Sequence, residues 1–170
     1  PVRVLWYSKD TRKKVSLSLF SWRNRGKGRT MKIVKAENLK KYYGQGQSLV
    51  KALDGVDMEV EKGEFVAIVG TSGSGKSTLL HLLGGLDYPT SREVEIDGKR
   101  LFTLKKDELC VFRRRKIGFV FQSYNLVPVL NVYENIVLPI ELDGEKADEK
   151  YIRSVIKLLG LEERLQDLPT

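Results

Sequence analysis

Eight consecutive residues carry the clearest chemistry in this sequence, because they place glycines, a lysine and a serine at the spacing of a phosphate-binding loop. Residues 70–77 read GTSGSGKS and fit the pattern G-x-x-x-x-G-K-[ST]. Glycines let successive backbone N–H groups turn toward one phosphate, and a lysine adds positive charge. The pattern predicts a nucleotide site formed by the following residues: Gly70, Thr71, Ser72, Gly73, Ser74, Gly75, Lys76, Ser77 and the adjoining Thr78.

The residues on either side favour this interpretation over a plain glycine-rich turn. Residues 65–69 form a short apolar run typical of a buried strand, and residues 77–83 can continue as a helix. A loop between them places a phosphate at a helix N-terminus, where unpaired N–H groups and the helix dipole favour an anion. We expect Lys76 to reach the β- and γ-phosphates and the Ser77 hydroxyl to bind Mg²⁺. The loop alone leaves open which nucleotide is bound and what its hydrolysis drives.

The net charge of +8 is confined to one end of the chain. Residues 1–30 hold nine basic residues and one acidic residue, whereas residues 31–170 hold 21 of each sign. The larger part therefore gives no electrostatic reason to bind nucleic acid. Residues 1–30 also lack the apolar length of a membrane span or a signal peptide. We interpret them as a basic leader, disordered or mis-started before Met31, and a tethering arm for anionic lipid or nucleic acid is the alternative.

Hydrophobic periodicity predicts the elements that must position the loop. Strands are expected at 34–39, 56–60, 65–69, 93–96 and 117–121, and helices at 77–83, 105–116, 131–138 and 147–159. The two strands before the loop are expected to be antiparallel, and the helix after it should end at Gly84-Gly85. Cys110 is the only cysteine, so no disulfide is possible within the chain, and we expect a small buried thiol.

Four blocks of residues, taken together, are more specific than the loop alone. They are YYG at 42–44 ahead of Ala52-Leu53, the loop 70–78, GLDYPTS at 85–91 and IGFVFQ at 117–122. Over residues 33–169 this combination resembles the ATP-binding subunit of an ABC transporter. Residues 125–128 and 134–139 are similar to the branch that includes lipoprotein-releasing, macrolide-export and antimicrobial-peptide-resistance ATPases.

The resemblance implies an α/β fold, that of a P-loop NTPase of the ABC ATPase type. Residues 31–170 would be the N-terminal portion of the ATP-binding domain. They would hold an antiparallel β subdomain and, from about residue 123, the start of a helical subdomain.

The resemblance also implies ATP and Mg²⁺ as cofactors and assigns roles to two further residues. Tyr43 best matches the residue that stacks on adenine, with Tyr42 as the fallback, although both rings could instead pack at a strand edge. Gln122 would contact Mg²⁺ and the attacking water, unless it is a simple polar strand end. Lys76 and Gln122 are then the predicted catalytic residues, and Ser77 and Gln122 the predicted metal ligands.

The chain departs from the family pattern in two respects. Arg92 stands where the family commonly has a glycine, and a positive φ there would cost about 1 kcal/mol. The 170 residues contain no Leu-Ser-Gly-Gly-Gln signature, so we expect the C-terminal part of the core, with its acidic catalytic groups, to be missing. We therefore expect the chain as given to bind ATP without turning it over.

The leading functional prediction is a peripheral ATPase subunit on the cytoplasmic face of the membrane. The resemblance implies a second ATP-binding subunit in a dimer and separate membrane-spanning permease subunits. In such an assembly ATP hydrolysis drives export or extraction of a substrate, which the sequence does not identify. The alternative is a soluble ABC-type protein acting on nucleic acid or in translation, or a non-hydrolysing regulator. We expect no nucleic-acid partner, since residues 31–170 are neutral overall.

Overall fold

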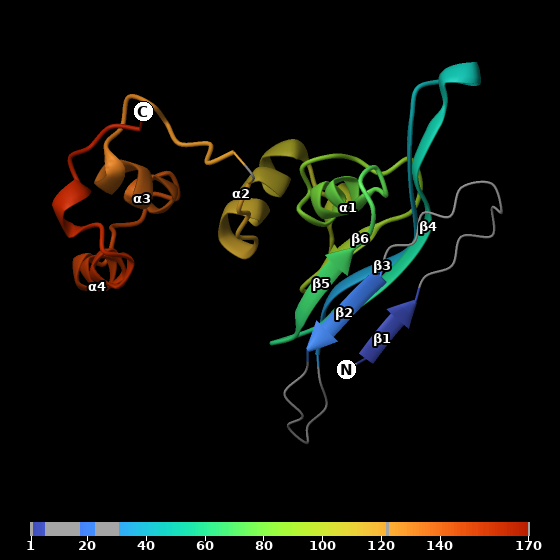
Figure 1. The fold of residues 1–170 in the computed structure, drawn as a ribbon, viewed down its shortest axis with the longest axis horizontal. Coiled ribbons are helices and arrows are strands. Elements are labelled where there is room, and N and C mark those ends of the chain that lie inside the picture. The colour runs from blue at the N-terminus through green and yellow to red at the C-terminus, as the bar shows by residue number, and fades with distance from the viewer. Residues whose placement is uncertain (1, 6–17, 23–30, 122, 170) are drawn as a thin grey trace. The chain divides into compact units, whose positions relative to one another are not determined.

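The computed structural model describes residues 2–5, 18–22, 31–121 and 123–169. The chain divides into two units, residues 1–109 and residues 110–170. The described strands and helix α1 belong to the first unit, and helices α3 and α4 belong to the second (Figure 1).

A four-stranded antiparallel sheet in the first unit has the order β4 (Val50–Glu61), β3 (Lys32–Tyr43), β6 (Val94–Ile96) and β7 (Lys99–Arg100). Ala36 of β3 lies opposite Met58 of β4 on one side and Val94 of β6 on the other. All three are buried. Because side chains alternate along a strand, the neighbouring Lys35 lies on the other face. The antiparallel pair predicted before the loop is confirmed as β3 and β4.

A second sheet carries the strand that leads into the phosphate-binding loop. Its order is β1 (Val2–Leu5), β2 (Ser18–Trp22) and β5 (Phe65–Val69), and both pairings are antiparallel. Strands β1 and β2 belong to the predicted leader, whose other residues lie outside those that the structure describes. The origin of the leader therefore stays a prediction.

Helix α1 (Lys76–Leu83) turns its apolar side into the core of the first unit. Leu79 and Leu82, three residues apart, are fully buried. From residue 31 onward, the other apolar residues of this unit with at most 3% exposure are Ala36, Leu39, Leu53, Val56, Val94 and Leu101. The helix ends before Gly84, and Gly85 takes the left-handed conformation with φ of 63°, so the predicted helix end is confirmed.

The second unit is built on α3 (Val132–Glu141) and α4 (Glu149–Leu159). Asn131 and Glu134 form a capping box at the start of α3, and Asp148 caps α4. Gly160 ends α4 with φ of 65°. Val137, Ile152 and Ile156 form the buried core of this unit. The two predicted helices are thus confirmed, with somewhat different ends.

Helix α2 (Lys106–Lys116) confirms the predicted surface helix but corrects the expectation for Cys110. Leu109 and Phe112 are buried, whereas Cys110 is exposed and accepts a hydrogen bond from Arg113. A helix turns about 100° per residue, so the position after Leu109 points away from the face that Leu109 and Phe112 share. Short 3₁₀ turns at Gly46–Ser48, Leu101–Thr103 and Glu162–Arg164 complete the described helical elements.

The strand predicted at residues 117–121 is wrong, because these residues are irregular in the structure. Val120 is 97% exposed. An apolar run becomes a strand only when neighbouring strands pair with its backbone, and no described strand does so here. Within the described residues, no helix combines the length and the apolar character needed to cross a membrane.

Candidate functional site

The predicted phosphate-binding loop joins β5 to α1, as its pattern requires. Gly75 is the N-cap of α1 and has a left-handed backbone with φ of 88°. A Cβ on this residue would lie 2.4 Å from the Ala52 carbonyl oxygen and 2.9 Å from Leu53 Cδ2. Only glycine therefore lets the loop pass this close to β4 in this conformation. The Gly75 carbonyl accepts the first turn's hydrogen bond from the Leu79 amide at 2.8 Å.

The Lys76 side chain folds back over the loop. Its ammonium group donates to the carbonyl oxygens of Gly70 at 2.8 Å and Thr71 at 2.7 Å, and to the Ser74 hydroxyl at 3.3 Å. Ser74 is 1% exposed, so the ammonium is anchored to a buried hydroxyl. The first amides of α1 have no partner inside the helix. The Lys76 ammonium and these amides place a positive charge and N–H donors at the N-terminus of α1, and such a combination can bind an anion.

Ser77 lies exposed in the first turn of α1, one residue after the lysine. A hydroxyl oxygen is a ligand type that Mg²⁺ accepts, usually alongside phosphate oxygens. Among the described residues, no group of three or more His, Cys, Asp or Glu side chains is arranged to hold a metal ion. Gln122, the other predicted metal ligand and catalytic residue, lies outside the described residues.

Tyr43, at the end of β3, is brought next to α1. Its hydroxyl donates to Asp87 Oδ2 at 2.8 Å. Burial raises the pKa of Tyr43, the bond to Asp87 adds to the rise, and the Thr78 side chain of α1 opposes it. The ring is 43% exposed. An aromatic face is therefore available beside the helix that follows the loop.

Tyr42 is directed to a different set of partners. Its hydroxyl donates to Asp54 of β4, and Lys51 lies 5.4 Å from its ring centroid. This hydrogen bond is the main reason why the pKa of Tyr42 rises to about 12. Of the two tyrosines, only Tyr43 has Thr78 of the loop region among the groups that act on its pKa.

Sequence reasoning missed the partners of Tyr43. Asp87 is 44 residues from Tyr43 in the sequence, and Lys41 binds Asp87 from the same strand as Tyr43. Neither residue has a spacing that would reveal the contact. Asp87 falls within one of the blocks that carry the family resemblance, which is the only signal that could have drawn attention to it.

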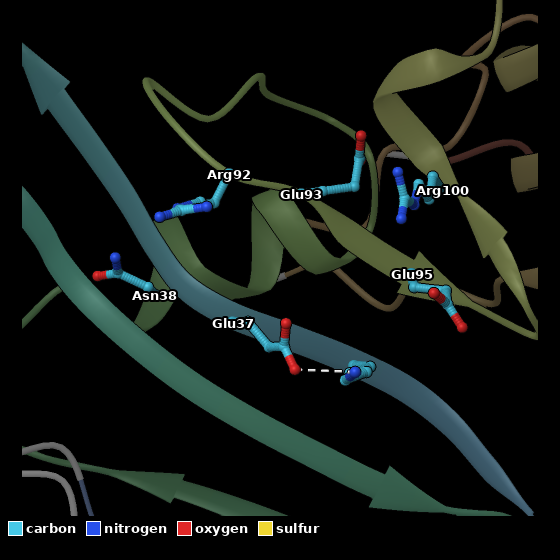
Figure 2. Close-up of a pocket in the computed structure, with 7 residues that line it drawn as sticks. Glu37, Asn38, Arg92, Glu93, Glu95 and Arg100 are labelled. Atoms are coloured by element: carbon cyan, nitrogen blue, oxygen red, sulfur yellow. Dashed lines mark ion pairs between the residues drawn. The ribbon is translucent and has the colours of Figure 1, made fainter.

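A cavity of about 520 Å³ opens at the four-stranded sheet, away from the predicted site residues. Its lining consists of charged and polar side chains: Lys35, Glu37, Asn38, Arg92, Glu93, Glu95 and Arg100. Figure 2 shows these side chains around the opening, with Glu37 ion-paired to Lys35 at 2.8 Å. None of the predicted nucleotide-binding residues lines it. Arg92 has a left-handed backbone with φ of 74°, so the condition under which arginine would be strained at this turn is met.

Comparison with known proteins identifies related sequences. A sequence profile of the family described as "ABC transporter" matches residues 53–169. An uncharacterized ABC transporter ATP-binding protein of Thermotoga maritima is 46% identical over 140 residues, covering 81% of this chain and 60% of the relative. The lipoprotein-releasing system ATP-binding protein LolD of Xylella fastidiosa is 42% identical over 76% of this chain and 54% of the relative. The macrolide export ATP-binding/permease protein MacB of Mannheimia succiniciproducens is 41% identical over 82% of this chain and 22% of the relative.

Solved structures agree with these sequence matches. A dimeric ATP-binding cassette in a post-hydrolysis state, bound to ADP and Pi, superimposes with a TM-score of 0.69 and 37% sequence identity. The match covers 81% of this chain and 62% of the solved chain. The chain therefore spans less than two thirds of the length of each of these relatives.

Proposed function

The chain belongs to the ABC transporter family of ATP-binding proteins, and on this basis we propose that the loop between β5 and α1 binds the phosphates of ATP with Mg²⁺. The observation that carries the proposal is the position of the Lys76 ammonium, bonded to the carbonyls of Gly70 and Thr71 beside the N-terminus of α1. The described loop has the glycine conformations, the charge and the amide donors that a triphosphate requires.

Each residue of the site then has a defined task. The amides of the loop and of the first turn of α1 donate hydrogen bonds to the phosphate oxygens. The Lys76 ammonium leaves the loop carbonyls and binds the β- and γ-phosphates instead. Tyr43 stacks its ring on the adenine base. Ser77 and Gln122 are the proposed ligands of Mg²⁺, and Lys76 and Gln122 the proposed catalytic residues. When bound, the ion neutralises phosphate charge, as magnesium does in P-loop enzymes.

We further propose that the whole protein is an ATPase subunit that pairs with a second copy and with membrane-spanning permease subunits. The names of the relatives support coupling to export or extraction, since one is a lipoprotein-releasing ATP-binding protein and another a macrolide export ATP-binding/permease protein. The dimeric state of the solved cassette supports the pairing. A peripheral position at the cytoplasmic face of the membrane follows from this assembly.

The relatives do not favour the alternative of a soluble protein acting on nucleic acid or in translation. The charge distribution agrees, because residues 31–170 carry equal numbers of basic and acidic residues. A phosphate-backbone partner would need a net basic surface on the folded part.

Titration calorimetry of the full-length protein with Mg-ATP tests the phosphate site. Lys76→Ala should weaken binding by about tenfold or more, because it removes a charge-assisted contact to the phosphates. Lys62→Ala is the matched control, since Lys62 is an exposed lysine in the turn after β4 and should leave the affinity unchanged. A folded full-length protein that takes up no Mg-ATP would contradict the proposal.

A further inference from the structure

Two adjacent tyrosines at the end of β3 are each tied to a carboxylate and a lysine. Tyr42 is bonded to Asp54, with Lys51 near its ring. Tyr43 is bonded to Asp87, with the Lys41 ammonium 4.8 Å from its ring centroid. The second set is the one near the phosphate-binding loop, because the side chain of Thr78, at the start of α1, acts on the pKa of Tyr43 and not on that of Tyr42. Asp87 itself has no role in the site described so far.

Asp87 is the centre of a small hydrogen-bond network. Its Oδ1 accepts from the Lys41 ammonium at 2.7 Å and from the Tyr88 amide at 2.7 Å, and its Oδ2 accepts from the Tyr43 hydroxyl at 2.8 Å. Lys41 donates a further bond to the Tyr88 carbonyl at 2.7 Å, and its side chain is only 12% exposed. The carboxylate is therefore fixed by three donors. One is the Tyr43 hydroxyl, and another, the Lys41 ammonium, also contacts the Tyr43 ring.

These contacts determine which face of the Tyr43 ring is open. The Lys41 ammonium lies over one face in cation–π contact, and the hydroxyl is held by Asp87. A flat base can stack only on the other face. The ring is thus held at both its edge and its face before any base arrives.

We propose that Asp87 is a positioning residue for nucleotide binding, which holds Tyr43 and Lys41 so that the open face of the Tyr43 ring meets the purine base of the bound nucleotide. The inference rests on the proposed ATP site and adds a residue to it. Asp87 acts through Tyr43 and does not touch the nucleotide. A ring that is already fixed loses less rotational freedom on binding, which improves the affinity for the base.

Binding of two probes separates positioning from general damage. Mg-ATP carries a base, whereas Mg-tripolyphosphate offers only the phosphates. In the full-length protein, Asp87→Asn should weaken Mg-ATP binding by about three- to tenfold, the loss that comes from leaving one side chain to be ordered on binding. The affinity for Mg-tripolyphosphate should stay within about twofold, because the hydrogen-bond partners of Asp87 are Lys41, Tyr43 and Tyr88, none of which belongs to the phosphate loop.

A double-mutant cycle tests whether Asp87 works through the ring. Tyr43→Ala should weaken Mg-ATP binding by about tenfold, and adding Asp87→Asn should cause no further loss. Asp54→Asn is the matched control, because it removes the equivalent carboxylate from Tyr42 and should leave the Mg-ATP affinity unchanged. Thermal unfolding of each variant checks that the fold is kept.

The outcomes distinguish this inference from the proposed function. If the unmodified protein binds neither probe, the ATP site itself is wrong. If the unmodified protein binds both probes, three results would overturn the positioning role. Asp87→Asn could weaken the binding of both probes equally, or it could leave Mg-ATP binding unchanged. It could also still weaken Mg-ATP binding in the Tyr43→Ala background. Selective loss of Mg-ATP affinity that disappears in the Tyr43→Ala background supports it.

Discussion

At the scale of single residues, the structure favours glycine at two positions of the loop for different reasons. Gly73 and Gly75 both have a left-handed backbone, with φ of 75° and 88°. A Cβ on Gly73 would meet no atom within 4 Å, whereas one on Gly75 would collide with the Ala52 carbonyl. The pattern G-x-x-x-x-G-K-[ST] predicts a glycine at position 75 but does not reveal the close approach of β4 that requires it.

Alanine substitutions at these two glycines should therefore differ in cost. Gly73→Ala should lower the free energy of unfolding by about 1 kcal/mol, the strain of a left-handed alanine. Gly75→Ala should cost about 2 kcal/mol or more, because the loop must also move away from β4. Urea unfolding of both variants measures the difference. Equal losses would show that the contact with Ala52 does not constrain the loop.

The hydroxyl of Tyr42 provides a second prediction at this scale. Its hydrogen bond to Asp54, together with partial burial, raises the pKa to about 12 from an ordinary value of about 10. Since the folded-state pKa is the higher one, the bond stabilises the fold fully below pH of about 10 and loses this effect as the pH rises toward 12. Asp54→Asn should shift the pKa back toward the ordinary value.

Ring carbon resonances of ¹³C-labelled tyrosine, followed against pH, measure this pKa directly. Tyr42→Phe identifies the signal and should also remove the loss of stability between pH of about 10 and 12. A Tyr42 signal that already titrates near the ordinary value in the unmodified protein would contradict the prediction.

At the scale of elements, the turn before β6 holds an arginine in a conformation that suits glycine. Arg92 has φ of 74° and lies between two fixed neighbours. Ser91 forms a bridge with Lys40 of β3, and the Glu93 carboxylate accepts hydrogen bonds from the amides of Val94 and Phe102 at 3.1 and 3.0 Å. Because both sides are held, the backbone at residue 92 cannot relax without breaking these bonds.

Arg92→Gly should accordingly stabilise the protein. Relief of about 1–2 kcal/mol of left-handed strain exceeds the 0.5–1 kcal/mol entropic cost of a glycine, leaving a gain of roughly 0.5–1 kcal/mol. Scanning calorimetry should show a rise in Tm of about 1–4 °C. Arg100→Gly is the control, because Arg100 is also exposed but has φ of −76°, so glycine should only destabilise there. A lower Tm for Arg92→Gly would contradict the strain argument.

Elements whose signals are local were predicted well from the sequence, and those that depend on distant partners were not. The helix after the loop follows from the loop pattern and Gly84-Gly85, and both need only neighbouring residues. Residues 117–121 are apolar enough for a strand, yet strand formation requires pairing that a single run cannot specify. The contact of Tyr43 with Asp87 likewise joins residues 44 positions apart. Resemblance to a family suggested the role proposed for Tyr43, but it did not indicate Asp87 as its hydrogen-bond partner.

At the scale of the whole molecule, the phosphate-binding loop and the proposed stacking residue both lie in the unit formed by residues 1–109. The contacts proposed for the phosphates and the base of ATP therefore come from one unit, namely from β3, the loop and α1. Hydrolysis requires more, because a water molecule must be aligned on the γ-phosphate while the developing charge is stabilised. The chain spans 62% of the length of the solved cassette that it matches.

We therefore predict that the 170-residue chain, when purified, binds Mg-ATP weakly and hydrolyses it no faster than the background rate. The loop is proposed to bind the phosphates, but the 170 residues contain no Leu-Ser-Gly-Gly-Gln signature, the segment expected to close the site on a second subunit. Steady-state phosphate release, compared with that of a chain extended to the length of its relatives, measures the difference. The extended chain should turn over ATP and lose this activity with Lys76→Ala. Turnover by the 170-residue chain of about one per second, abolished by the same substitution, would show that these 170 residues suffice for catalysis.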